Sequence, residues 1–263
     1  MTARLLIDLS HPIEPGMTTY PGLPGPVVSD FLSREGSRRK YVPGTTFQIG
    51  RIEMVANTGT YVDAPFHRIA GGQDIASLPL ERLADLEGLV VTLPPVPAGV
   101  NAGERHLLPL PAGEGGGEGP LLPLPAGEGG GEGPRRRAFD ADLFERRDFE
   151  GKAVLLRSGW DSYWRTPAYG RGHPFVTRRA AEVLVSARPS LVGIDSVNID
   201  DTDDGTRPAH TLLLQAGIPI VEHLCNLAEL PAEGFRFHCV PAPFRAVGSF
   251  PVRAYAVIGK DAK

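Results

Sequence analysis

Apolar and polar residues follow two kinds of pattern along this chain, and the pattern changes several times. Short apolar runs bounded by Gly, Pro or polar residues are typical of buried strands, whereas apolar residues at helical spacing behind a capping residue indicate helices. Strand-like runs lie at 5–10, 46–56, 89–93, 152–159, 191–196, 218–224, 236–241 and 252–258. Helix-like runs lie at 79–88, 140–147, 177–187 and 210–217. Because strands and helices alternate and extra strands lie at both ends, the pattern predicts a single α/β domain with a mixed β-sheet and flanking helices.

Capping and stop signals set the expected ends of these elements. Asp140 and Thr177 are suitable N-cap residues for the helices that follow them. Gly88 and Gly217 are expected to end the helix-like runs that precede them. In the run at 46–56 the apolar positions change face near Gly50, which predicts a β-bulge there.

One segment does not fit this pattern. The sequence LLPLPAGEGGGEGP at 107–120 is followed by an identical copy at 121–134. Gly and Pro dominate both copies, so ordering them would cost conformational entropy with little apolar burial in return. The sequence therefore predicts one domain over 1–263, with a low-complexity insertion at about 99–137 that forms a disordered or extended surface loop.

Composition excludes several classes of protein. Of the 263 residues 41% are hydrophobic and 22% charged, and the formal net charge is −4. No basic stripe indicates nucleic-acid binding, and no apolar run approaches the ~18 residues that a membrane span needs. The start of the chain has no signal-peptide pattern, so a cytoplasmic protein is expected. Cys225 and Cys239 form no CxxC pair, which argues against a zinc ribbon or a disulfide framework.

The densest group of reactive side chains is NTGTYVDAPFHR at 57–68. Since Ala64 precedes a proline, the segment is expected to be extended. Tyr61, Asp63 and His67 would then share one face. Asp63 is a candidate oxygen ligand or general base, and His67 a candidate proton shuttle or ligand. The alternative is a surface loop in which Asp63 caps a helix and His67 is an ordinary polar residue.

A second group lies in the last third of the chain. His210 begins a predicted helix, and Glu222 lies inside the apolar run IPIVEHL. A carboxylate in such a run is costly unless it is paired or bound to a cation. The alternative is that Glu222 pairs with an arginine and His210 is exposed at the start of its helix.

These motifs resemble those of the cyclase family, which includes bacterial kynurenine formamidase and isatin hydrolase. The hallmark of that family is HxGTHxDxPxH, and residues 57–67 read NTGTYVDAPFH. Further similar segments are DLSHPIEPGMTTYPG at 8–22, LLRSGWDSYW at 155–164, LVGIDSVNID at 191–200 and HTLLLQAGIPIVEHLCNL at 210–227. They cover nearly the whole chain outside the insertion, so the resemblance implies the swivelling β/β/α-like fold of that family.

The resemblance also implies roles for individual residues. Asp63, His210 and Glu222 match metal ligands, and His67 matches the general acid/base. Asn57 and Tyr61 stand where the family has ligand histidines. An amide oxygen is a fair ligand for hard cations and a poor one for Zn²⁺, so Asn57 is a candidate ligand. Two such replacements argue against a two-metal site, which leaves one divalent metal (Zn²⁺, Mn²⁺ or Mg²⁺) or none.

The expected function is hydrolysis of a C–N bond in an amide, formamide or small cyclic amide. With a metal, His67 would move a proton to the leaving nitrogen. Without one, His67 and Asp63 would activate water, and Tyr61 and Asn57 would donate hydrogen bonds to the oxyanion. The alternatives are a lyase that uses the same histidine and a non-catalytic homologue that only binds a small molecule.

Partners follow from the same expectation. A small-molecule substrate is expected, with no nucleic acid and no membrane, and the resemblance implies a homo-oligomer, either dimer or tetramer. Aromatic residues are the candidates for lining a substrate pocket: Tyr20, Phe66, Trp160 and Trp164.

Overall fold

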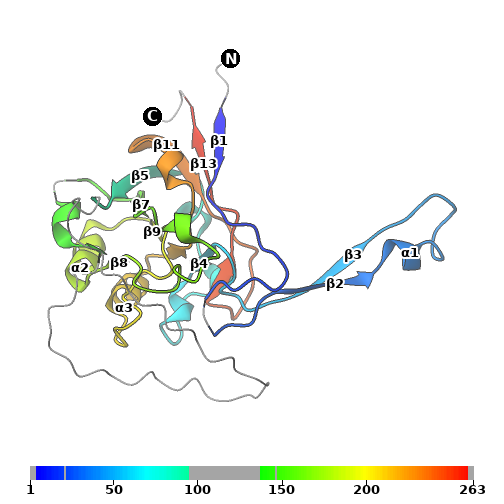
Figure 1. Ribbon diagram of the computed structural model, residues 1–263. Coiled ribbons are helices and arrows are strands. Elements are labelled where there is room, and N and C mark those ends of the chain that lie inside the picture. Colours follow the sequence, from blue (N-terminus) through cyan, green and yellow to red (C-terminus); the bar gives the residue numbers. More distant parts are fainter. Residues whose placement is uncertain (1–3, 21, 95–136, 146, 260–263) are drawn as a thin grey trace. The chain divides into compact units, whose positions relative to one another are not determined.

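Nine strands form one mixed sheet in the computed structural model, which describes residues 4–20, 22–94, 137–145 and 147–259 (Figure 1). Apart from Arg137, the predicted insertion at 99–137 and both repeats lie outside the described residues. The order across the sheet is β1 (Leu5–Asp8), β13 (Tyr255–Ile258), β11 (Glu233–His238), β5 (Leu86–Thr92), β7 (Ala153–Arg157), β9 (Leu191–Ile194), β10 (Ile220–Glu222), β4 (Tyr61–Asp63) and β12 (Ser249–Pro251).

The centre of the sheet is parallel and its two sides are antiparallel. Strands β5, β7, β9 and β10 run parallel to one another, whereas all pairings of this sheet outside this group, including those of β5 with β11 and of β10 with β4, are antiparallel. The central strands are buried on both faces, as their continuous apolar runs predicted. The expected mixed sheet in a single α/β domain is therefore confirmed.

Two hydrophobic cores lie on the two faces of this sheet. Along β7, Leu155 belongs to one core, and its neighbours Val154 and Leu156 belong to the other. Helices α2 (Arg178–Ala187) and α3 (Pro208–Gln215) cover the second face with residues such as Leu184 and Leu213. The first core is closed by strands from both ends of the curled sheet together with short 3₁₀ turns.

The capping signals act much as the sequence predicted. Thr177 caps α2 by accepting a hydrogen bond from the Ala180 amide. Gly217, with φ of 72°, follows the end of α3. Asp140 caps only a 3₁₀ helix, Ala141–Phe144, where a longer helix was expected. Within the described residues, none of the helices has the length and apolar composition that a bilayer-crossing helix requires.

The helix predicted at 79–88 is wrong. A 3₁₀ turn at Leu80–Arg82 is followed, after residues 83–85, by β5, which begins at Leu86. Gly88 does not end a helix but lies inside that strand. The Phe235 ring occupies the space where a β-carbon on Gly88 would stand, 1.9 Å from the nearest ring atom. A glycine at this position therefore allows the Phe235 side chain of β11 to pack directly against the backbone of β5.

A hairpin of two further strands forms a separate sheet. Strand β2 (Val27–Leu32) pairs antiparallel with β3 (Ile49–Glu53), and the short helix α1 (Arg34–Ser37) lies between them in sequence. Figure 1 shows this hairpin extending away from the main sheet. The pairing shifts register between Asp30 and Leu32, so the bulge lies on β2, opposite the Gly50 that the sequence indicated.

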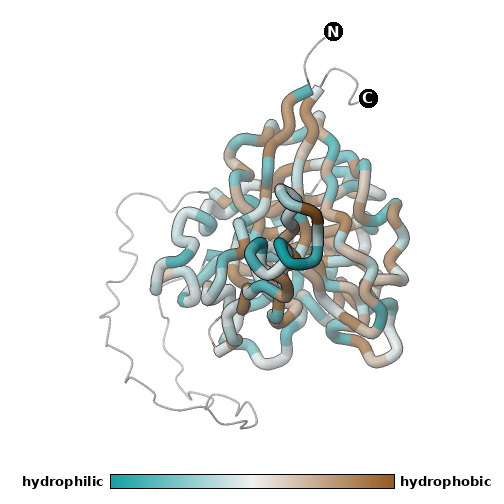
Figure 2. Tube along the Cα trace, turned by 90° about the vertical axis from the view of Figure 1, so that its right-hand side faces the viewer, coloured by the Kyte–Doolittle hydropathy of each residue, from teal (hydrophilic) through white to brown (hydrophobic). Residues whose placement is uncertain are grey.

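Hydrophobic stretches (brown) and hydrophilic ones (teal) alternate along the chain trace in Figure 2. Several large apolar residues of the hairpin are exposed. Every residue of β3 is exposed. Short remaining elements are β6 (Ala138–Phe139), paired parallel with β8 (Phe175–Val176), and the 3₁₀ turns η1 (Pro65–His67), η2 (Ile75–Ser77), η5 (Trp160–Tyr163) and η6 (Leu227–Glu229).

Candidate active site

The two groups of reactive residues meet because β4 pairs with β10. In this antiparallel register Tyr61 lies opposite Glu222, and Asp63 lies opposite Ile220. All three residues of β4 are buried. On its other side β4 pairs with β12, which sets Ser249 opposite Asp63. The sheet thus brings together motifs that are about 160 residues apart in sequence.

His67 reaches the site by a turn and not by an extended strand. Ala64 is extended, as expected of a residue before proline, but the 3₁₀ turn η1 begins at Pro65. The prediction that the segment stays extended as far as His67 is therefore wrong. The turn places His67 Nδ1 3.7 Å from Asp63 Oδ1.

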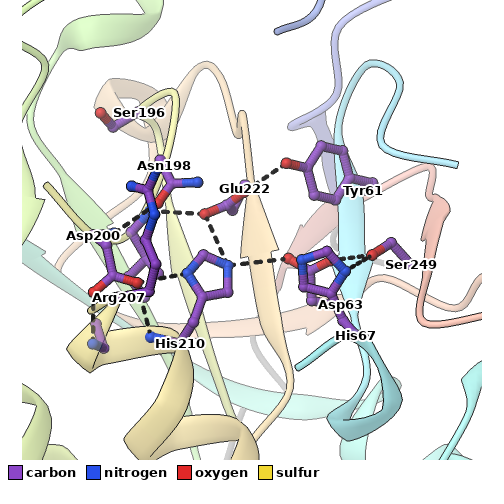
Figure 3. A network of polar contacts seen from close by, with 12 residues as sticks. Tyr61, Asp63, His67, Ser196, Asn198, Asp200, Arg207, His210, Glu222 and Ser249 are labelled. Atoms are coloured by element: carbon purple, nitrogen blue, oxygen red, sulfur yellow. Dashed lines mark hydrogen bonds and ion pairs between the residues drawn. The ribbon is translucent and has the colours of Figure 1, made fainter. Parts of the chain in front are cut away.

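His210 is fixed in the first turn of α3 by a buried carboxylate. Asp200 accepts hydrogen bonds from the Ala209 amide (2.6 Å), the His210 amide (3.0 Å) and His210 Nδ1 (2.7 Å). Nδ1 is thus the donor, and Nε2 faces the other carboxylates (Figure 3). His210 Nε2 lies 3.7 Å from Asp63 Oδ2 and 3.6 Å from Glu222 Oε1.

Charge is concentrated around this imidazole. Burial alone would lower the pKa of His210, but the carboxylates of Glu222, Asp200 and Asp63 outweigh it and raise that pKa to about 10. Burial raises the pKa of Glu222 to about 7, against the attraction of His210. The raised pKa favours the protonated form of His210, whose Nε2 lies 3.7 Å from Asp63 Oδ2 and 3.6 Å from Glu222 Oε1.

Of the two residues that replace the expected histidines, Tyr61 contacts Glu222 directly. The Tyr61 hydroxyl donates a 2.6 Å hydrogen bond to Glu222 Oε2. Burial raises the Tyr61 pKa well above its usual value, so the phenol stays protonated. The Asn57 side chain acts in the opposite direction and lowers the pKa of Tyr61, against the larger effect of burial. Glu222 Oε1 accepts from the Ile199 amide at 2.7 Å, so both oxygens of this carboxylate have donors.

The donor set fits one divalent cation. Asp63, His67 and His210 each offer a ligand atom, and these atoms lie within 4.8 Å of one another. Asp63 Oδ2 is buried and has no hydrogen-bond partner, which is costly for an anionic oxygen unless a cation is near. Glu222 Oε1 flanks the same His210 nitrogen.

The predicted aromatic residues differ in their relation to the site. Trp164 stacks on His11 with centroids 4.0 Å apart and lies edge-on to His223, whose ring in turn lies 5.3 Å from that of Tyr61. Trp160 donates its indole N–H to the Tyr169 carbonyl.

The remaining two aromatic candidates come from other segments. Phe66 is adjacent to His67 on η1 and is 40% exposed. Tyr20 is half-buried. Which of the four aromatic residues touches a substrate stays a prediction.

Two polar residues of the site were not singled out from the sequence. Asp200 orients His210. In the sequence, the only sign of this contact is that Asp200 lies ten residues before His210. Ser249 contacts both Asp63 and His67 but is more than 180 residues away from them in sequence, so no local pattern indicates it.

Comparison with known proteins identifies the family. The model of the family described as "Putative cyclase" matches residues 7–107 and 138–201. A kynurenine formamidase of Bacillus cytotoxicus is 24% identical over 254 residues, covering 97% of this chain and 98% of that protein. A kynurenine formamidase of Paracidovorax citrulli is also 24% identical, over 259 residues and 96% of each chain.

Solved structures show the same fold. An isatin hydrolase bound to the product analogue thioisatinate has a TM-score of 0.69 and 20% identity, covering 98% of this chain and 93% of that one. Isatin hydrolase A from Labrenzia aggregata, bound to benzyl benzoate, has a TM-score of 0.68 and 19% identity, covering 97% and 94%. Since the family model matches more than half of the 263 residues, the chain belongs to the cyclase family.

Proposed function

We propose that this protein hydrolyses a C–N bond in an amide, formamide or small cyclic amide, with the help of one divalent cation. The observation that carries the proposal is the buried meeting of Asp63, His210 and Glu222, with His67 beside them. The relatives named kynurenine formamidase and isatin hydrolase support the choice of bond.

Asp63 and His210 would hold the cation, and in this proposal the third ligand is Glu222, whose Oε1 lies 3.6 Å from His210 Nε2, and not His67, which belongs to the same group of ligand atoms. Two carboxylates and one imidazole suit Zn²⁺, Mn²⁺ or Mg²⁺. To bind it, His210 gives up its Nε2 proton while Asp200 keeps the ring in place through Nδ1. When bound, such a cation polarises a carbonyl oxygen and acidifies water. Tyr61 holds Glu222 in one orientation through its hydrogen bond to Oε2.

His67 is the proton carrier in this proposal. Asp63 and His210 are buried, whereas 35% of the His67 side chain is exposed, so His67 can meet both a substrate and solvent. A histidine in this position takes a proton from the attacking water and delivers it to the leaving nitrogen.

The first test combines metal analysis with a substrate panel. The protein would be assayed with N-formyl arylamines, isatin and, as a comparison, simple esters, before and after treatment with a chelator. We expect turnover of an amide substrate that falls on chelation and returns with Zn²⁺, Mn²⁺ or Mg²⁺. Hydrolysis of esters alone, or of no compound in the panel, would contradict the assigned reaction.

A second test addresses His67 directly. His67→Ala should lower kcat by roughly 10²–10⁴-fold, the usual contribution of a positioned acid/base, and should leave metal content unchanged. His238→Ala is a matched control. His238 lies on β11 and stacks on Tyr255 of β13, and four strands separate β11 from β4 in the sheet. If His67→Ala also loses the metal, His67 is a ligand and not the proton carrier.

A hydrolase without a metal is the second candidate, and the charge on His210 favours it. With its pKa raised to about 10, His210 already supplies a positive charge between Asp63 and Glu222 at neutral pH. Activity that survives complete chelation would select this mechanism, in which His67 and Asp63 activate water.

We further propose that the protein is a homo-oligomer, either dimer or tetramer, and that the hairpin β2–β3 takes part in its interface. Its large apolar side chains are exposed: Val27, Val28, Phe31, Ile49 and Ile52. Exposed apolar groups gathered on one element are typical of interaction sites. The expected cytoplasmic location, and the expected lack of nucleic-acid and membrane partners, stay predictions.

A further inference from the structure

Ser249 lies at the start of β12 and is buried between two residues of the candidate site. Its hydroxyl donates a hydrogen bond to Asp63 Oδ1. The same oxygen lies 2.9 Å from His67 Nδ1. Figure 3 shows Ser249 on one side of the His67 ring and His210 on the other.

Counting protons fixes the direction of these two bonds. An Asp63 carboxylate can only accept, so the single hydroxyl proton of Ser249 goes to Asp63. The Ser249 oxygen can then only accept from His67, which must carry its proton on Nδ1. In neutral His67 the free lone pair is therefore on Nε2, the nitrogen that does not face Ser249.

No other described contact of His67 Nδ1 replaces this one. Asp63 Oδ1 lies 3.7 Å from Nδ1, which is beyond hydrogen-bond distance. Without the Ser249 hydroxyl, the His67 ring would lose the acceptor that holds its Nδ1 proton.

The backbone of β12 fixes this arrangement. Ala64 donates its amide hydrogen to the Gly248 carbonyl at 2.8 Å. A β-carbon on Gly248 would stand 2.6 Å from His67 Cα and 2.7 Å from His67 N. Only a glycine at 248 allows β12 to pack this closely against η1, and the next residue is then Ser249.

We propose that Ser249 is a positioning residue that holds His67 as the Nδ1–H tautomer and keeps the Nε2 lone pair free for the site. The effect of Ser249 on turnover rests on the proposed function. The tautomer of His67 does not rest on it, because the hydrogen bonds that set this tautomer form whether or not an amide is the substrate.

The test reads the tautomer by NMR. Metal-free protein labelled with ¹⁵N-histidine would be studied at pH about 8, above the ordinary imidazole pKa near ~6.5. Long-range ¹H–¹⁵N correlations show which ring nitrogen carries the proton, and His67→Gln assigns the signal. We expect the Nδ1–H form in the wild type and in Ser249→Thr, which keeps a hydroxyl. Ser249→Ala should lose this single form.

A matched control and a kinetic readout accompany the spectra. Ser196→Ala removes another buried hydroxyl, which donates to the Pro174 carbonyl and contacts His173, and it should leave the His67 signal unchanged. Ser249→Ala should lower kcat by about 10–100-fold, with a smaller change in KM, as expected for loss of an orienting hydrogen bond.

Two results would overturn the proposal. One is a wild-type His67 protonated on Nε2, and the other is an unchanged tautomer in Ser249→Ala. If Ser249→Ala does not fold, the wild-type and Ser249→Thr spectra still decide between the two forms. If no amide is hydrolysed, the proposed function fails, while the NMR result still accepts or rejects the role of Ser249.

Discussion

At the scale of single residues, Tyr61 decides how much of Glu222 is available to a cation. Its phenol is protonated and hydrogen-bonded to Glu222 Oε2. A cation that binds Glu222 through Oε2 therefore competes with the hydrogen bond from the Tyr61 hydroxyl. A histidine at position 61 has no hydroxyl to make this bond.

The double substitution Asn57→His with Tyr61→His should raise Zn²⁺ affinity by orders of magnitude, because imidazole suits zinc far better than an amide oxygen or a phenol. Bound zinc should also stabilise the fold, by about 2.7 kcal/mol when free metal is a hundred times the dissociation constant. Zn²⁺ titration of chelator-treated protein, followed by Tm, measures both effects. Equal affinity in the wild type would show that Asn57 and Tyr61 do not weaken the site.

Gly248→Ala should be far more damaging than its size suggests. The new methyl group would meet the His67 backbone at 2.6–2.7 Å, so β12 or η1 must move. We expect a loss of about 1–3 kcal/mol in the free energy of unfolding together with lower turnover. Gly205→Ala is the control, since a β-carbon there meets no atom within 4 Å. Urea unfolding of both variants makes the comparison, and equal stability of the two would refute the close-contact argument.

The four main site residues could be singled out from the sequence, and their supporting residues could not. Asp63, His67, His210 and Glu222 stand in dense local motifs whose chemistry is unusual for their surroundings. Ser249 stands in an ordinary strand, and its importance arises from pairing with β4. A residue whose role depends on a partner far away in sequence leaves no local pattern.

At the scale of elements, the β2–β3 hairpin is the part whose apolar side chains the main sheet leaves exposed. The variant Phe31→Ser with Ile52→Ser should reduce the molar mass in solution toward that of a monomer, with little loss of stability. The two side chains are 76% and 65% exposed, so they contribute little to the fold of one chain. Size exclusion with light scattering is the measurement.

Leu80→Ser is a suitable control for that experiment. Leu80 is an exposed apolar residue of similar size, at 62% exposure, but it lies on η3 (Leu80–Arg82) and not on the hairpin. Unchanged mass in the hairpin variant, or a monomeric wild type, would show that the exposed hairpin residues serve no assembly.

Sequence patterns predicted the central strands better than the outer elements. Strands β7 and β9 are continuous apolar runs that end at clear signals, and they are buried on both faces. Strand β12 has three residues, one of them a proline, which suits the edge of a sheet but gives no periodic signal. At 79–88, helix propensity was outweighed by pairing of β5 with β11, which tertiary contacts decide.

At the scale of the whole molecule, the duplicated segment should be dispensable. It joins β5 to β6, and its composition offers little to bury. Deleting 121–134, and then 107–134, should each leave Tm within a few degrees, because closure entropy changes by only about 0.6 kcal/mol for each doubling of loop length. A large fall in Tm, or a change of molar mass, would mean that the repeats pack against another surface.

The position of β4 between β10 and β12 has a consequence for how the protein is made. Tyr61 and Asp63 leave the ribosome early, but their partners Glu222 and Ser249 follow 161 and 186 residues later. Contacts so distant in sequence form slowly, and until they form, these polar groups remain in water. The candidate site is therefore among the last parts to be completed during synthesis, so we expect no activity from a nascent chain that has not yet reached β12.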